Sequence, residues 1–137
     1  MMDKLSDREV IARTLDGEAG NQGLDGLQGV GSVILTRVNL RWQGETTARG
    51  VCLHHSQFSC WLPGPDYDRI TADDYVAPQA CLNIADQILA GTLPDNTNGA
   101  DSYEVTGTRA YWAKGLEPSK VIGSQSFYVT RAKAPNQ

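Results

Sequence analysis

The sequence has few of the features that mark several large classes of protein. It has three cysteines, an odd number that cannot all pair within one chain, which argues against a disulfide-dense secreted scaffold and favours free thiols. No apolar run approaches the roughly 20 residues that span a bilayer, so we expect no stable insertion into a membrane. The net charge is −4 and lysine and arginine are not clustered, so we expect no binding to nucleic acid.

The length and composition indicate one domain. A chain of 137 residues with 40% hydrophobic residues can form a single continuous core. We predict a domain over residues 1–129 and a frayed polar tail over residues 130–137. Residues 1–6 lack the basic-then-apolar pattern of a signal peptide, so we expect synthesis in the cytoplasm. The oligomeric state is open, and a monomer is favoured.

Two amphipathic patterns near the start of the chain predict helices. Ser6 and Glu9 form a capping-box signature, so the first helix is expected to begin at Asp7 and to end within residues 17–20. Residues 24–39 then show the apolar spacing of a buried second helix. Its small residues predict a tight crossing with the first helix; these are Gly29, Gly31 and Ser32.

The rest of the chain is less regular. Residues 40–77 have no clear period and are predicted to form an ordered loop. Pro78 suits the first turn of a further helix that ends at Gly91. Residues 93–129 alternate turn signals with short β-branched or aromatic pieces, which predicts short strands or a small hairpin. The predicted fold class is therefore α+β, mainly α.

Glu18 occupies an unusual place in the first helix. Ile11, Leu15 and Glu18 follow the spacing of one helix face, so the carboxyl group replaces an apolar side chain at the end of a buried stripe. Burial and the negative end of the helix dipole would both raise its pKa. A carboxyl group of raised pKa suits a general acid, and glycoside cleavage is its commonest setting. The alternative is a helix-end glutamate whose carboxylate reaches water.

Glycosidases usually need two carboxyl groups. Several acidic residues could partner Glu18, and spacing singles out none of them: Asp16, Asp25, Glu45, Asp66 and Asp95. A lone acid/base would imply the lytic transglycosylase route, in which a hydroxyl group of the substrate closes on the anomeric carbon. The alternative is a muramidase-type hydrolase, in which the same group acts on water. Polar and aromatic side chains elsewhere could line a sugar cleft: Gln57, Ser59, Asn98, Tyr103, Tyr111, Trp112 and Tyr128.

A group of thiols and imidazoles suggests two other chemistries. Cys52, His54, His55 and Cys60 lie within nine residues, but their spacing matches no common zinc pattern. We therefore expect no metal and no cofactor. Cys60 with His55 could be the nucleophile and base of a cell-wall peptidase, although no third orienting group is evident. The remaining possibility is that the cysteines pack in the core and the histidines lie on a loop surface.

Five segments, taken in order, resemble the spore-cortex-lytic family of cell-wall hydrolases, the SleB and CwlJ type. They are Ala12–Ala19, Gly29–Val38, Gln57–Trp61, Asn98–Ala100 and Ile122–Tyr128. The resemblance implies a lysozyme-like, lytic-transglycosylase-type fold and cleavage of peptidoglycan between N-acetylmuramic acid and N-acetylglucosamine. It also implies that Glu18 is the catalytic acid/base. The substrate-binding residues that it implies are Gln57, Phe58 and Ser59 opposite Glu18, and Asn98, Gly99, Trp112, Gln125 and Tyr128 at sugar subsites.

The chain departs from that family at two motifs. Gly20-Asn21-Gln22 stands where the family usually has Arg-Gly-Glu, so we expect no second catalytic carboxylate at Gln22. Gln125 stands where the family usually has histidine, and an amide forms hydrogen bonds but does not titrate near neutral pH. These losses keep open a non-catalytic peptidoglycan-binding or virion structural protein on the same fold. For an enzyme, a phage or prophage product released to the wall, or one carried in the virion, is the expected setting.

Overall fold

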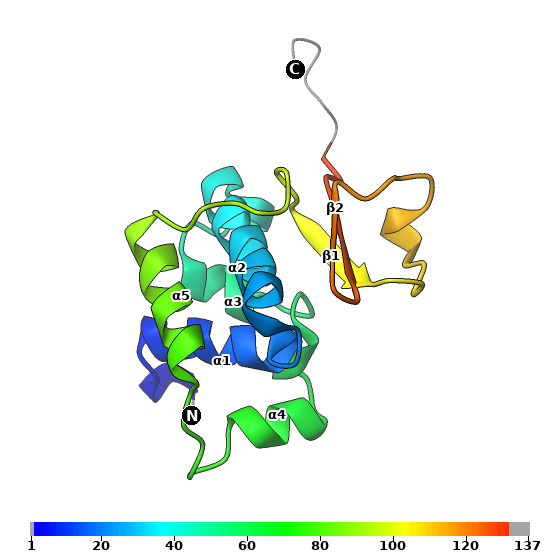
Figure 1. Cartoon of the computed structure of the whole chain (residues 1–137). Coiled ribbons are helices and arrows are strands. Elements are labelled where there is room, and N and C mark those ends of the chain that lie inside the picture. The colour runs from blue at the N-terminus through cyan, green and yellow to red at the C-terminus, as the bar shows by residue number, and fades with distance from the viewer. Residues whose placement is uncertain (1, 132–137) are drawn as a thin grey trace.

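The structure, a computed structural model, describes residues 2–131 and has helix α2 at its centre (Figure 1). Helices α1 (Asp7–Ala19), α2 (Gly23–Leu40) and α5 (Gln79–Ala90) pack against one another around the main hydrophobic core. A small sheet lies against another side of α2. Among the residues described, no helix combines the length and the apolar composition that a membrane span requires.

The three long helices confirm the sequence predictions, apart from small shifts at their ends. The Ser6 hydroxyl accepts a hydrogen bond from the Glu9 backbone N–H at 3.1 Å, which caps α1. The Glu9 side chain accepts from Arg13 at 2.9 Å, so the carboxylate half of the predicted capping box is not formed. Gly91 ends α5 in the left-handed conformation, with φ of 71°.

Residues 40–77, predicted as a loop, contain short helices. These are η2 (Trp42–Gly44), α3 (Ala48–Leu53), η3 (Ser59–Trp61) and α4 (Pro65–Ile70). None exceeds six residues, so none shows a hydrophobic period along the sequence. Local signals start the two α-helices: the Thr47 hydroxyl caps α3, and Pro65 occupies the first turn of α4. Two further 3₁₀ helices lie outside this segment, η1 (Met2–Lys4) and η4 (Tyr111–Ala113).

The predicted short strands form a three-stranded antiparallel sheet in the order β1-β3-β2. The strands are β1 (Ser102–Val105), β2 (Lys120–Ile122) and β3 (Gln125–Tyr128). Tyr103 pairs with Phe127, and β2 and β3 form a hairpin through Gly123 and Ser124. All four residues of the central strand β3 are buried.

The small residues of α2 serve neighbours other than the predicted one. A Cβ at Gly29 would lie 2.7 Å from the Phe127 ring, and one at Gly31 would lie 2.9 Å from Ile84. These glycines therefore admit the sheet and α5, and the predicted tight crossing with α1 at these positions is wrong. The atoms nearest to these two positions belong to the sheet, to α5 and to Leu93, and none of them belongs to α1.

The ordered chain continues beyond the predicted end of the domain. Asp101 accepts hydrogen bonds from the backbone N–H and hydroxyl group of Thr130, and it pairs with Arg131 at 2.9 Å. Thr130 and Arg131, which the prediction assigned to the tail, are thus bonded to the buried Asp101 carboxylate. Residues 132–137 of the predicted tail lie outside the described part of the chain.

Candidate active site

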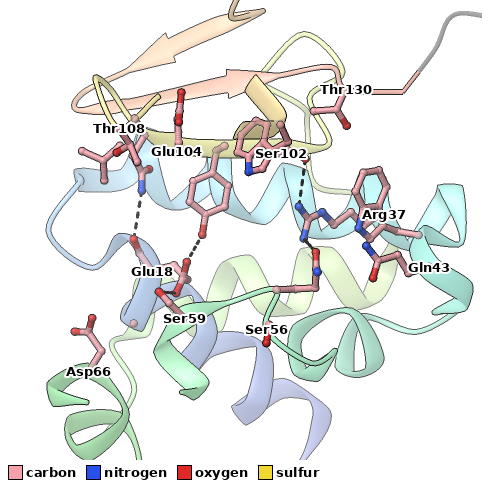
Figure 2. Close-up of a pocket in the computed structure, with 17 residues that line it drawn as sticks. Glu18, Arg37, Gln43, Ser56, Ser59, Asp66, Ser102, Glu104, Thr108 and Thr130 are labelled. Carbon is pink, nitrogen blue, oxygen red and sulfur yellow. Dashed lines mark hydrogen bonds between the residues drawn. The ribbon is translucent and has the colours of Figure 1, made fainter. Parts of the chain in front are cut away.

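A cavity of about 740 Å³ opens beside Glu18. Figure 2 shows Glu18 and Ser59 facing Glu104 and Thr108 across it, with Arg37 and Gln43 farther along. A second hollow of about 680 Å³ shares Gly17, Glu18, Asp66, Val105 and Gln125 with the first. Glu18 thus lies where two hollows meet.

Glu18 ends the apolar stripe of α1. Ile11 and Leu15 are fully buried, whereas Glu18 is partly exposed, so the stripe passes from the core to the wall of the cavity. Gly17 matters here, because a Cβ at that position would lie 2.6 Å from the Cβ of Cys60. The close approach lets the Cys60 backbone N–H donate to Glu18 Oε2 at 3.0 Å, and the Ser59 hydroxyl donates to the same oxygen at 3.5 Å.

Tyr103 supplies the contact on the other carboxylate oxygen. Its hydroxyl group, from β1, donates a hydrogen bond to Glu18 Oε1. Burial, and then the charge of Glu18, raises the pKa of Tyr103 well above its usual value, so the phenol keeps its proton and remains a donor. Both oxygens of Glu18 therefore have partners on other segments of the chain, and the alternative of a carboxylate simply extended into water does not describe this site.

Gln125 and Gln22 join the turns around Glu18. The Gln125 side-chain amide donates to the backbone oxygen of Glu18 at 3.3 Å, and its own oxygen is buried without a partner among the described residues. The side-chain oxygen of Gln22 accepts from the backbone N–H and hydroxyl group of Ser124. Gln125 thus connects β3 to the last turn of α1, and Gln22 connects the α1–α2 turn to the turn between β2 and β3.

The cavity brings together part of the predicted set of binding residues. Besides Glu18, it is lined by Gln57, Ser59, Trp112 and Gln125. Trp112 packs edge-on against Tyr128, with ring centroids 5.4 Å apart. It is 39% exposed, so part of its surface is open to a ligand.

Four predicted binding residues lie elsewhere. Phe58 is 2% exposed because its ring packs in the core near Tyr103, and Tyr128 is buried with its hydroxyl group bound to Glu104. Asn98 donates to the backbone of Ser119, and the Gly99 N–H donates to Asp95, which shapes the turn before β1. The structure places none of Phe58, Asn98, Gly99 and Tyr128 in the wall of the cavity.

The possible second carboxylates are mostly engaged elsewhere. Asp16 pairs with Arg69 at 2.6 Å, Glu45 with His54 at 2.6 Å, and Asp95 holds the turn at Thr97. Asp25 lines a separate hollow. Of the five candidates, Asp66 is the one that lines the cavity beside Glu18.

Sequence reasoning missed Glu104 and Arg37 as cavity residues, and it named Tyr103 only as one of several aromatic residues. Glu104 lines the cavity and accepts hydrogen bonds from the Tyr128 hydroxyl group and the Ala110 N–H. Tyr103 lies 85 positions from Glu18 along the chain, and no spacing rule relates residues so far apart. The alternation along β1 could have shown only which of its residues share a face.

The thiols are poorly placed for nucleophilic chemistry. Cys60 is buried with its sulfur 4.0 Å from the Thr14 carbonyl oxygen, and burial raises its pKa. Burial also raises the pKa of Cys52 to about 12. His55 is exposed, and His54 is held by Glu45. Within residues 2–131, no three His, Cys, Asp or Glu side chains are grouped as metal ligands would be.

Comparisons with known proteins give a family and a fold for the chain. The family model described as Cell Wall Hydrolase matches residues 21–128, a range that begins just after Glu18. One similar solved structure is the catalytic domain of the germination-specific lytic transglycosylase SleB from Bacillus anthracis, at 23% identity and a TM-score of 0.69, over 92% of this chain and 98% of that one. Another is the catalytic domain of the Bacillus cereus SleB protein, at 23% identity and a TM-score of 0.70, over 89% and 88%. No curated protein matches the chain. The structural likeness confirms the predicted α+β, lysozyme-like fold.

Proposed function

The chain belongs to the cell wall hydrolase family, and on that basis we propose that it cleaves peptidoglycan strands between N-acetylmuramic acid and N-acetylglucosamine, with Glu18 as the acid/base. The observation that carries the proposal is the position of the Glu18 carboxylate at the junction of two hollows. A polymer can extend to both sides of a carboxylate in that position. The site therefore suits cleavage within a strand.

The chemistry needs one carboxyl group. In the first step, the protonated Glu18 gives its proton to the glycosidic oxygen as the bond to the anomeric carbon breaks. In the second step, the Glu18 carboxylate takes a proton from the attacking group. When that group is the C6 hydroxyl of the muramyl residue, the product has a 1,6-anhydro end. When it is water, the product has a reducing end.

The neighbours of Glu18 act by positioning it. The Tyr103 hydroxyl group and the Cys60 N–H hold one carboxylate oxygen each, which limits the directions in which the acid can point. Glu104 also lines the cavity, but each of its carboxylate oxygens already accepts a hydrogen bond, one from the Ala110 N–H and one from the Tyr128 hydroxyl group. We assign the lone acid/base to Glu18 and favour transglycosylation, the activity of the similar SleB catalytic domain from Bacillus anthracis.

Replacement of Glu18 tests the proposal directly. Glu18→Gln keeps the size and hydrogen bonding of the side chain but cannot supply the proton, so clearing of purified cell walls should fall by about 10³-fold. Glu117→Gln, a change at an exposed glutamate, is the matched control and should retain full activity. Clearing by Glu18→Gln at the rate of the unmodified protein would sink the acid/base assignment.

Mass spectrometry of the released fragments identifies the reaction. Anhydro-muramyl ends show transglycosylation, and fragments heavier by one water show hydrolysis. New free amino groups without glycan cleavage would show a peptidase and would overturn the proposal. A non-catalytic wall-binding protein would bind the walls and release no fragments.

A further inference from the structure

Arg37 is a buried cation in the wall of the cavity that forms no ion pair with a carboxylate among the described residues. It is 6% exposed, and it lies in α2, which also supplies Leu27, Val30 and Ile34 to the core. Asp101 is close, but its carboxylate pairs with Arg131, and Arg37 reaches only its backbone oxygen, at 2.7 Å. Burial of a charge without an oppositely charged partner costs free energy, so the arrangement needs a physical explanation.

The guanidinium group has unused hydrogen-bonding capacity. Its two long bonds, of 3.4 Å each, join Nη1 to the Gln57 side chain and Nη2 to the Ser102 hydroxyl group (Figure 2). A guanidinium carries five N–H donors, so each terminal nitrogen keeps one N–H without a partner among the described residues. Two such N–H groups are what a carboxylate accepts in a bidentate pair.

Aromatic rings restrict the orientation of this group. The guanidinium carbon lies 4.9 Å from the centroid of the Trp42 ring and 5.4 Å from that of Phe58. Stacking leaves the edge of the guanidinium as the direction for a further hydrogen bond. Trp42 also lines the cavity, and its indole N–H is buried without a partner among the described residues. A second unused donor thus lies in the same wall.

Two other residues that line the cavity with Arg37 have a strained backbone. Gln43 and Ser56 have φ of 51° and 62°, in the left-handed region that residues other than glycine rarely adopt. Such strain is often found at ligand sites. We call this part of the cavity the Arg37 arm and define it by Arg37, Trp42, Gln43, Ser56, Gln57 and Ser102.

We propose that the Arg37 arm binds a carboxylate of the muramyl residue, through the free N–H groups of Arg37. This inference rests on the proposed function, since peptidoglycan strands carry carboxylates on the muramyl residues. Two sources share that chemistry: the lactyl group, where it bears no peptide, and the attached peptide. A carboxylate in this place would also offset the burial that lowers the pKa of Arg37.

Binding to the Glu18→Gln protein tests the proposal, because the measurement does not need turnover. The three probes are glycan strands with their peptides, strands stripped to free lactyl carboxylates, and stripped strands whose lactyl groups are converted to neutral methylamides. Calorimetry should show binding at least about tenfold tighter for a carboxylate-bearing probe than for the neutral one. Tight binding of the stripped strands identifies the lactyl group, and tight binding of the peptide-bearing strands alone identifies the peptide. Equal binding of all three probes overturns the proposal.

Variants of Arg37 in the same background connect the preference to this side chain. Arg37→Gln should abolish the preference, and Arg37→Lys, which keeps the charge, should retain part of it. Arg8→Gln is the control, since Arg8 is a half-buried arginine that pairs with Asp86 and lines neither hollow. A preference that persists in folded Arg37→Gln protein overturns the proposal. Should that variant fail to fold, the lysine variant and the three probes still decide.

The two proposals can fail separately. An unmodified protein that cuts no strand but prefers carboxylates through Arg37 contradicts the catalytic role of Glu18 and supports the Arg37 arm. Cleavage that depends on Glu18 but binding that ignores carboxylates does the reverse.

Discussion

The helical part of the molecule and its strand part are held together by different forces. Helices α1, α2 and α5 share a continuous apolar core that includes Ile11, Leu15 and Val30. The strand part has a much smaller cluster, formed by Val33, Ala100 and Phe127. The helical part therefore depends mainly on apolar packing, and the strand part depends more on polar contacts.

Carboxylates do much of the stabilising work in the strand part. Asp101 is fully buried and accepts from Ser102, Thr130 and Arg131, which joins the start of β1 to the chain that follows β3. Asp95 accepts from two N–H groups and a hydroxyl group in the preceding turn. The cleft thus has one wall placed by apolar packing and another placed by directed hydrogen bonds, and Glu18 with Tyr103 lies between them.

The largest expected effect is on the helical part. Leu15→Ala removes a fully buried side chain between helices and should lower the free energy of unfolding by about 3 kcal/mol. Urea denaturation measures the change. Leu24→Ala, at a leucine that is 68% exposed, is the control and should alter stability by less than about 0.5 kcal/mol. Similar values for the two variants would contradict the picture of one apolar helical core.

The next effect concerns the contact between the two parts. Tyr103→Phe removes the hydroxyl group that holds Glu18 Oε1, so kcat should fall about 10- to 100-fold with little change in KM. Tyr67→Phe, at a tyrosine that lines neither of the two hollows beside Glu18, should leave kcat unchanged. Steady-state cleavage of purified strands distinguishes the variants. An equal loss in kcat for both, or a rise in KM alone, would argue against a positioning role for Tyr103.

The smallest effect is a change in pH dependence that originates in the strand part. Burial by itself would raise the pKa of Asp101, but hydrogen bonds from Thr130, Ser102 and Arg131 outweigh it, and the pKa lies below the usual 3.8. A lowered folded-state pKa contributes stability above about pH 4, and that stability is lost as the pH falls through the lower folded-state value.

Asp101→Asn removes this contribution. Stability at pH 7 should fall by about 1 kcal/mol, and the further loss as the pH falls below about 4 should be shallower than in the unmodified protein. Denaturation at a series of pH values measures both quantities. Asp74→Asn, a change at an exposed aspartate, is the control. An acid profile of Asp101→Asn that matches the unmodified one would show that Asp101 does not provide this pH dependence.

Sequence patterns predicted the elements whose defining signals lie within their own residues or directly beside them. The first helix, the second helix and the helix after Pro78 each have a long apolar period and clear end signals, so local rules located them. Helices α3 and α4 were not predicted, because six residues are too few to show a hydrophobic period. The binding residues were less well predicted, because a motif residue such as Phe58 can support the site from within the core.

By itself, the sequence determined that a carboxyl group continues the inward face of α1 and that the chain has the motifs of a cell-wall hydrolase. Helical spacing and short motifs both involve only residues that are close in the sequence, so neither inference needed knowledge of the chain path. The tertiary structure alone decided that Tyr103 and Cys60 hold Glu18, and that Arg37 faces the same cavity. Those contacts join residues far apart in the chain, and hydrogen bonds of about 3 Å form only once packing has brought their atoms together.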